Sequence, residues 1–171
     1  MKKKILITGI NGYIGNSLNK FLLIKGFDVW GIDKKSYNNK TIKINLLNYK
    51  ETKKCIKSFS SFDVIIHTAA IAHKNSFFKN KKHNTNIIIT QNIINSIKNI
   101  NCHFIFLSSI SVYGEDKRKS PVRTKDLLLP SSSYGKSKKK CEEILKNSIK
   151  NCDILRLSPV YSSSNLIDIK K

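Results

Sequence analysis

Short apolar runs alternate along the chain with longer stretches in which apolar residues recur at helical spacing. The apolar runs predict strands at residues 4–8, 27–33, 41–46, 63–68, 103–108 and 153–157. The helical spacing predicts helices at residues 17–25, 49–59, 84–100 and 132–150. Strands that alternate with helices predict an α/β fold, a Rossmann-type doubly wound parallel sheet with helices on both faces.

Length and charge limit the classes of protein to consider. A chain of 171 residues fits one domain, which we expect to span residues 1–171. The net charge of +21 would attract nucleic acid or another polyanion. Nearly all of this charge is lysine spread along the chain, a bias that AT-rich codon usage produces. We therefore expect a solvated basic surface and no nucleic-acid site.

Membrane segments and metal sites are not expected from the sequence. The apolar run from Ile5 to Ile7 after the basic start is shorter than the roughly 7 to 15 residues of a signal peptide, so we expect a cytoplasmic protein without a membrane segment. The four cysteines are scattered and form no C-x-x-C pair, which favours reduced structural thiols and argues against a metal site. They are Cys55, Cys102, Cys141 and Cys152.

Three glycines follow the first predicted strand and precede the first predicted helix. Glycine permits positive φ and close backbone approach, and a helix N-terminus offers free N–H groups to phosphates. This position in the chain favours a dinucleotide pyrophosphate site over a purely structural turn. The candidate residues are Gly9, Asn11, Gly12, Tyr13, Ile14 and Gly15.

A carboxylate ends the second predicted strand. Asp33 could accept hydrogen bonds from both hydroxyls of the adenosine ribose, and its charge would repel a 2′-phosphate. Lys34 and Lys35 follow at once and would partly offset that repulsion. The sequence therefore favours NAD over NADP as the cofactor.

A tyrosine and a lysine stand four positions apart in the last predicted helix and share one face of it. Tyr134 is a poor base at neutral pH because a phenol titrates near pH ~10, but the ammonium of Lys138 and a positive nicotinamide ring would lower its pKa. The segment from Ser108 to Gly114 (SSISVYG) ends the preceding strand, where ligands of α/β sheets bind. The tyrosine could then take a proton from a sugar hydroxyl during hydride transfer.

Taken together, these motifs resemble a known family. The pattern T-G-x-x-G-x-x-G, followed by HTAA from His67, then Asn86, SSISVYG and YGKSK, is similar to the extended short-chain dehydrogenase/reductases of the NAD-dependent epimerase/dehydratase group. The likeness runs from Lys3 to about Val160, with the motifs in the family's order.

The resemblance implies a role for several residues. It makes Ser109 a catalytic hydroxyl, Tyr134 the base, and Lys138 the residue that lowers the base's pKa and holds the nicotinamide ribose. The other residues that it places at or near the cofactor are His67, Ala69 and Ala70 in a loop, Asn86 as a supporting helix residue, and Asn45 and Leu46 at the end of the third predicted strand. Relatives often have Asp where this chain has Asn45.

The resemblance also favours one reaction among several. Sugar 4,6-dehydratases of the family place Asp-Glu where this chain has Ile110 and Ser111, so a dehydratase is disfavoured. An NAD-dependent epimerase of UDP-hexoses at carbon 4, acting in surface-polysaccharide synthesis, is the favoured function. A nucleotide-sugar 4-ketoreductase and a non-catalytic remnant that binds NAD or a polyanion stay open.

The family pattern continues beyond this chain. We expect residues 159–171 to begin an incomplete C-terminal substrate-binding region, so that most of the pocket for a UDP-sugar is missing. The resemblance further implies a homodimer through the helices near 84–100 and 132–150.

Overall fold

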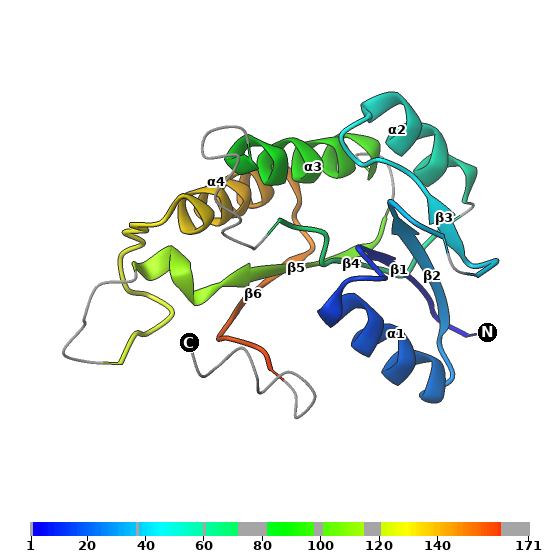
Figure 1. Ribbon diagram of the computed structural model, residues 1–171, viewed down its shortest axis with the longest axis horizontal. Coiled ribbons are helices and arrows are strands. Elements are labelled where there is room, and N and C mark those ends of the chain that lie inside the picture. Colours follow the sequence, from blue (N-terminus) through cyan, green and yellow to red (C-terminus); the bar gives the residue numbers. More distant parts are fainter. Residues whose placement is uncertain are drawn as a thin grey trace.

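Six parallel strands form one sheet in the computed structural model of the chain, which describes residues 2–36, 38–59, 61–71, 82–97, 101–114 and 121–161 (Figure 1). The strands are β1 (Lys4–Thr8), β2 (Asp28–Asp33), β3 (Thr41–Lys43), β4 (Val64–His67), β5 (His103–Ser109) and β6 (Cys152–Leu157). Their order is β3-β2-β1-β4-β5-β6, and each neighbouring pair is parallel. This order reverses between β1 and β4, which confirms the doubly wound fold.

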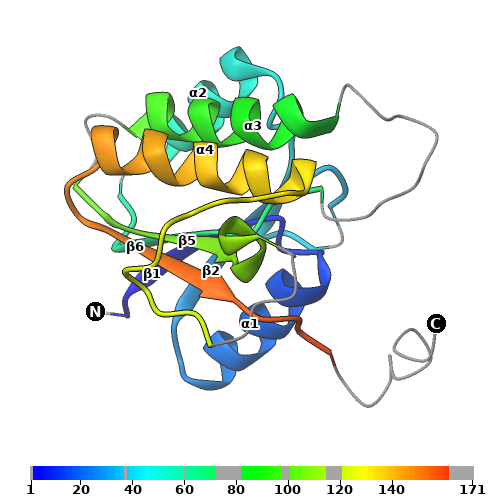
Figure 2. The same cartoon turned by 90° about the vertical axis from the view of Figure 1, so that its left-hand side faces the viewer.

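Helices cover both faces of the sheet unequally. Helix α1 (Tyr13–Ile24) lies on one face, and α2 (Tyr49–Ser58), α3 (Lys82–Ile97) and α4 (Ser133–Ser148) lie together on the other (Figures 1 and 2). A short 3-10 helix, η1 (Ile110–Tyr113), follows β5 directly. The three-helix layer places α3 between α2 and α4.

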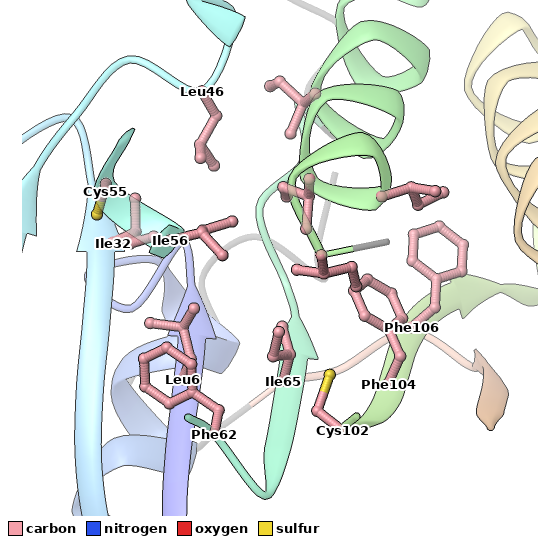
Figure 3. Packing of buried hydrophobic residues seen from close by; sticks show 14 of the residues in the cluster. Leu6, Ile32, Leu46, Cys55, Ile56, Phe62, Ile65, Cys102, Phe104 and Phe106 are labelled. Atoms are coloured by element: carbon pink, nitrogen blue, oxygen red, sulfur yellow. The ribbon is translucent and has the colours of Figure 1, made fainter. Parts of the chain in front are cut away.

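The buried side chains form two clusters, one on each face of the sheet. Alternate residues of β1 point to opposite faces, so Leu6 packs beneath the three-helix layer while Ile5 and Ile7 pack beneath α1. Phe104 and Phe106 of β5 join the larger cluster (Figure 3). Burial on both faces explains why the central strands β1 and β4 are runs of apolar residues, whereas the edge strand β6 (CDILRL) alternates between exposed and less exposed positions.

The observed elements differ from the predicted ones mainly at their ends. The strand predicted at 41–46 ends at Lys43, because the chain turns where the side chain of Asn45 accepts a hydrogen bond from the Leu47 amide (3.2 Å). The helix predicted from residue 17 already begins at Tyr13, where the Asn16 amide donates to Gly12 O (2.8 Å). Residues 98–100 of the helix predicted at 84–100 lie outside the described residues.

Two further observations concern the membrane and the cysteines. Within the described ranges, none of the helices combines the length and the apolar character that crossing a bilayer requires. All four cysteines are free thiols. Burial raises the pKa of Cys55 to about 11, so this thiol stays protonated at neutral pH.

Candidate cofactor-binding and active site

A cleft lies over the carboxyl ends of β1, β2 and β4, the place where open α/β sheets bind ligands. Its cavity has a volume of about 350 Å³. The residues that line it are Gly9, Asn11, Gly12, Asp33, Lys34, Lys35, Ile44, Leu46, Thr68, Ala69, Ala70, Ile71 and Ile89. The cleft thus has a polar part near the glycine turn and an apolar part toward Leu46.

The glycine turn has no room for side chains. Gly9 has φ +73°, and a Cβ atom there would lie 2.8 Å from the Cα of Ala69. A Cβ atom on Gly15 would lie 2.2 Å from Gly9 O. At Gly9 and Gly12, which line the cavity, the turn therefore presents backbone without side chains to the cleft. Among the described residues, no side chain caps the N-terminus of α1 at Gly12, and the first turn of α1 carries no acidic residue, so its N–H groups suit a phosphate.

Asp33 is held in place by backbone donors. Its Oδ2 accepts a hydrogen bond from the Asn11 amide (3.0 Å) and its Oδ1 accepts one from the Lys34 amide (2.7 Å). Each carboxylate oxygen can accept a further bond, so both could still bind ribose hydroxyls. The side chain of Asn11 donates to Lys35 O (2.7 Å), which fixes the segment after Asp33 at the rim of the cleft.

His67 precedes the loop at residues 68–71, which lines the cavity, but His67 itself does not line it. Its side chain is 1% exposed and lies between the hydroxyls of Thr8 (Nδ1, 2.7 Å) and Thr90 (Nε2, 3.0 Å). The Thr90 hydroxyl donates its proton to Asn86 O (2.8 Å), so Nε2 of His67 must be the donor and Nδ1 the acceptor. Burial and the charge of Lys138 lower the pKa of His67 to about 3, which keeps the ring neutral.

The neutral state of His67 makes the stability of the fold depend on pH. Its pKa is about 6.5 in an unfolded chain and about 3 in the fold. The unfolded chain therefore binds one more proton than the folded chain below pH 6.5. Between pH 6.5 and 3, the free energy of unfolding falls by about 1.4 kcal/mol for each pH unit that the pH is lowered. We expect urea denaturation to show that His67→Gln loses about 2 kcal/mol less stability than the wild type between pH 6.5 and 5.

The wild type and the His67→Gln variant share every other titrating group, so those contributions cancel in the comparison. Parallel pH profiles for the two proteins would contradict a neutral His67 in the fold.

Asn86 joins the loop at residues 68–71 to α4, the helix that carries Tyr134. Its Oδ1 accepts from the Ile71 amide (2.8 Å), and its Nδ2 donates to Ile71 O (3.2 Å) and to the Ser137 hydroxyl (3.2 Å). The side chain is buried and lies outside the lining of the cavity. Asn86 thus acts on the cleft through Ile71, which lines it.

The predicted catalytic residues lie on α4 and at the end of β5. Ser132 caps α4 by accepting from the Gly135 amide (3.1 Å), which starts the helix one residue before Tyr134. Lys138 is 3% exposed, donates to Leu107 O (2.7 Å) and has its Nζ 5.8 Å from the centroid of the Tyr134 ring. Ser109 donates to the hydroxyl of Ser111 (3.1 Å) and caps η1.

The surroundings of Tyr134 shift its pKa upward in the protein alone. Burial raises the pKa of Tyr134 in the protein alone, whereas a base requires a lower value. The ammonium of Lys138 lies beside the phenol ring, and burial lowers its own pKa to about 8. Lowering the pKa of Tyr134 would therefore need the second positive charge that the sequence argument invoked, that of a nicotinamide ring.

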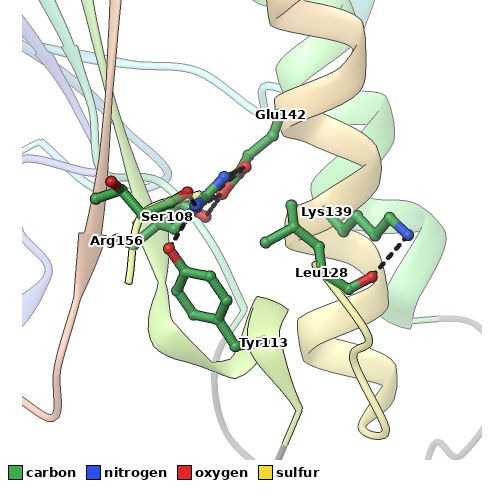
Figure 4. A network of polar contacts seen from close by, with 7 residues as sticks. Ser108, Tyr113, Leu128, Lys139, Glu142 and Arg156 are labelled. Atoms are coloured by element: carbon green, nitrogen blue, oxygen red, sulfur yellow. Dashed lines mark hydrogen bonds and ion pairs between the residues drawn. The ribbon is translucent and has the colours of Figure 1, made fainter. Parts of the chain in front are cut away.

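A buried ion pair that the sequence reading missed stands behind these residues (Figure 4). Glu142 is 1% exposed and accepts from the Ser108 hydroxyl (2.6 Å) and from Nη2 of Arg156 (2.7 Å). Arg156 also donates through Nη1 to the hydroxyl of Tyr113 (2.5 Å) and to Thr124 O (3.1 Å). The available signal was that Glu142 follows Lys138 by one helical turn on the same face. The pair ties β5, β6, η1 and α4 together.

The neighbouring serines at the end of β5 have different surroundings. Ser108 is buried and bonded to Glu142, whereas Ser109 is partly exposed beside Ser111. Residues that follow each other in a strand point to opposite faces, which separates the two hydroxyls. This arrangement leaves Ser109 as the serine available to a ligand.

The cavity brings together only part of the predicted cofactor-binding set. The predicted residues that line it are Gly9, Asn11, Gly12, Asp33, Leu46, Ala69 and Ala70. Those that do not line it are Tyr13, Ile14, Gly15, Asn45, His67, Asn86, Tyr134 and Lys138. Sequence reasoning did not name Ile44, Thr68, Ile71 and Ile89, whose apolar or small side chains carry no chemical signal on their own.

Comparison with known proteins gives consistent matches. Residues 5–168 match the model of a family described as the NAD dependent epimerase/dehydratase family. The spore coat polysaccharide biosynthesis protein SpsK of Bacillus subtilis is 27% identical over 171 residues, which cover 96% of this chain and 56% of SpsK.

Two solved structures share the fold over most of this chain. The structure of UDP-glucuronic acid 4-epimerase from Bacillus cereus, in complex with UDP-glucuronic acid and NAD, has a TM-score of 0.75 at 30% identity and covers 90% of this chain and 55% of that one. The UDP-Glc/GlcNAc 4-epimerase from Campylobacter jejuni has a TM-score of 0.79 at 27% identity and covers 90% of this chain and 53% of that one. The chain spans about half the length of these proteins.

Proposed function

Because the chain belongs to the NAD dependent epimerase/dehydratase family, we propose that it binds NAD in the cleft and forms the cofactor-binding part of a nucleotide-sugar 4-epimerase. The observation that carries the proposal is the glycine turn, where Gly9 and Gly12 line the cleft without side chains. The uncapped N-terminus of α1 also supports NAD binding, because its N–H groups can donate to a diphosphate and no acidic residue in its first turn repels the phosphates.

Different parts of the site would hold different parts of the cofactor. The turn from Gly9 to Gly15 would bind the pyrophosphate, and Asp33 would bind the adenosine ribose. The apolar end of the cleft at Leu46 would receive the adenine. Lys138 would bind the nicotinamide ribose, with Leu107 O holding its ammonium in place.

The reaction would use the three polar residues at the end of β5 and on α4. When bound, the nicotinamide ring supplies the hydride acceptor and a positive charge beside the phenol. Tyr134 would remove the proton from a sugar hydroxyl at its Oη and later return it. Lys138 would stabilise the phenolate by its charge, and Ser109 would hydrogen-bond the reacting oxygen.

The substrate class rests on similarity and on residue types. The Bacillus cereus relative is described with UDP-glucuronic acid, and the Campylobacter jejuni relative as acting on UDP-Glc and UDP-GlcNAc. Ile110 and Ser111 offer no acid to assist loss of water, which supports epimerisation over dehydration. We further propose that a substrate-binding region starts at residues 159–171, of which 162–171 lie outside the described residues. We also propose that α3 and α4 form a dimer surface.

Calorimetry with NAD, followed by turnover of UDP-glucose and UDP-N-acetylglucosamine, tests the proposal. We expect this chain to bind NAD. In the protein with a complete substrate-binding region, we expect Tyr134→Phe to lower turnover by about 100-fold or more because its proton carrier is gone. NAD affinity should change less than threefold, roughly, since the phenol ring stays in place. Tyr49→Phe on the exposed surface of α2 is the matched control and should keep full turnover.

The possible results separate the alternatives. Binding of NAD without any epimerisation would support a non-catalytic NAD-binding protein, and net reduction of a 4-keto sugar would support a ketoreductase. Salt-sensitive binding of nucleic acid with no affinity for NAD would overturn the proposal.

A further inference from the structure

We propose that Asn92, on the inner face of α3, is a positioning residue that fixes the adenine end of the cofactor cleft. This inference rests on the proposed binding of NAD. Asn92 itself does not line the cavity. It would act through the backbone of the segment after β3, on which the wall residue Leu46 stands.

Asn92 holds that segment with both hydrogens of its side-chain amide. The side chain is 9% exposed, and its Nδ2 donates to Leu46 O (2.9 Å) and to Leu47 O (3.2 Å). These bonds join residues about 46 positions apart in the sequence. A buried amide nitrogen that donates to two successive carbonyl oxygens fixes both the position and the direction of the backbone at Leu46 and Leu47.

Apart from the packing of Ile44 and Leu46 in the core, the segment after β3 has few bonds to other elements. Strand β3 has three residues, lies at the edge of the sheet and, within the described residues, pairs only with β2. Beyond it, the Ile44 amide still donates to Asp33 O (2.8 Å), and the next bonds are local ones made by Asn45. Asn92 therefore supplies a side-chain tether to this segment from the helix layer.

The tethered segment forms the apolar end of the cleft. Leu46 is buried beside α3 (Figure 3). It lines the cavity together with Ile44, Ile71 and Ile89. Ile89 stands on α3 one turn before Asn92, so a single helix carries one wall residue and the tether of another. Asp33 occupies the neighbouring polar part, which leaves the flat and largely apolar adenine for the end at Leu46.

The substitution Asn92→Asp tests this role because it keeps the size of the side chain and removes the donor. A carboxylate would face two carbonyl oxygens and push the segment away from α3. The matched control is Asn95→Asp on the same helix. The side-chain oxygen of Asn95 accepts from Gln91 (3.1 Å) and, within the described part of the chain, makes no hydrogen bond to the segment after β3. A carboxylate oxygen can accept that bond equally well.

Comparing ligands with and without an adenine separates a local effect on the adenine end from a general loss of stability, which would weaken both kinds of ligand. Calorimetry with NAD and ADP-ribose, and NMR titration with nicotinamide mononucleotide, are compared for the wild type and both variants. We expect Asn92→Asp to weaken NAD and ADP-ribose by about tenfold or more, as the loss of two hydrogen bonds implies, and to leave the mononucleotide within twofold, roughly. Asn95→Asp should match the wild type with all three ligands.

Equal weakening of ADP-ribose and the mononucleotide, or no weakening of ADP-ribose, would overturn the role of Asn92 while NAD binding by the wild type stands. A wild type that binds none of the three ligands would instead overturn the proposed function. If circular dichroism shows that Asn92→Asp is unfolded, Asn92→Ala takes its place, with the same expected split between ligands.

Discussion

Replacing Gly15 with alanine is expected to abolish measurable NAD binding. The added Cβ atom would lie 2.2 Å from Gly9 O and 2.9 Å from the Cα of Ile10, far inside van der Waals contact. Both atoms belong to the backbone of the turn, so no side-chain rotation relieves the clash. Helix α1 would have to move away from the turn, and the N–H groups proposed to bind the pyrophosphate would no longer converge. Calorimetry with NAD measures the effect.

Gly26→Ala is the control for this substitution. Gly26 ends the same helix at φ +83° with nothing within 4 Å of an added Cβ atom, so alanine there strains the backbone without a clash. We expect it to cost about 1 kcal/mol of stability and to leave NAD affinity unchanged. Gly15→Ala protein that is folded and binds NAD within tenfold of the wild type, roughly, would contradict the geometry of the turn.

Glu142→Gln is expected to lower the free energy of unfolding by about 3–5 kcal/mol. The carboxylate is buried and is bonded to Arg156 through Nε and Nη2, as well as to Ser108. The neutral amide would leave the partly buried guanidinium without its counter-charge. Urea denaturation at neutral pH measures the change.

The neighbouring residue in the sequence gives a control of the same chemistry. Glu143 pairs with Lys140 (3.0 Å), but both side chains are largely exposed, so Glu143→Gln should cost less than about 1 kcal/mol. The double variant Glu142→Gln and Arg156→Met should be more stable than Glu142→Gln alone, because no unpaired charge remains. Equal losses for Glu142→Gln and Glu143→Gln would show that burial of the pair has no energetic consequence.

Much of the fold follows from local pattern. The central strands β1, β4 and β5 are mainly apolar runs, because side chains pack on both faces of the sheet there, and the glycine turn stands where β1 passes into α1. The ends of elements were less predictable. The first turn of α1 is built from the glycine motif itself, so its apolar spacing starts only later, and β3 stops early because of a side-chain bond of Asn45.

The site was less accessible from sequence because its supporting bonds join distant residues. Asn92 meets Leu46, and Glu142 meets Ser108 about 34 positions away. The sequence shows that a polar residue stands on a helix face expected to be buried, but it does not show which distant residue that side chain bonds. The pKa of Tyr134 shows the same limit, since burial in the folded protein reverses the direction that the nearby Lys138 alone would suggest.

The hydrogen-bond chain through His67 has a consequence for a protein of such high net charge. From the Ala69 amide through Thr8, His67 and Thr90 to Asn86 O, every link is neutral. Dissolved ions screen the field of the surface lysines, but they have no charge to act on in this buried chain. The wall of the cleft at Ala69 would therefore keep its position across ionic strengths at which the attraction of the surface for anions varies widely.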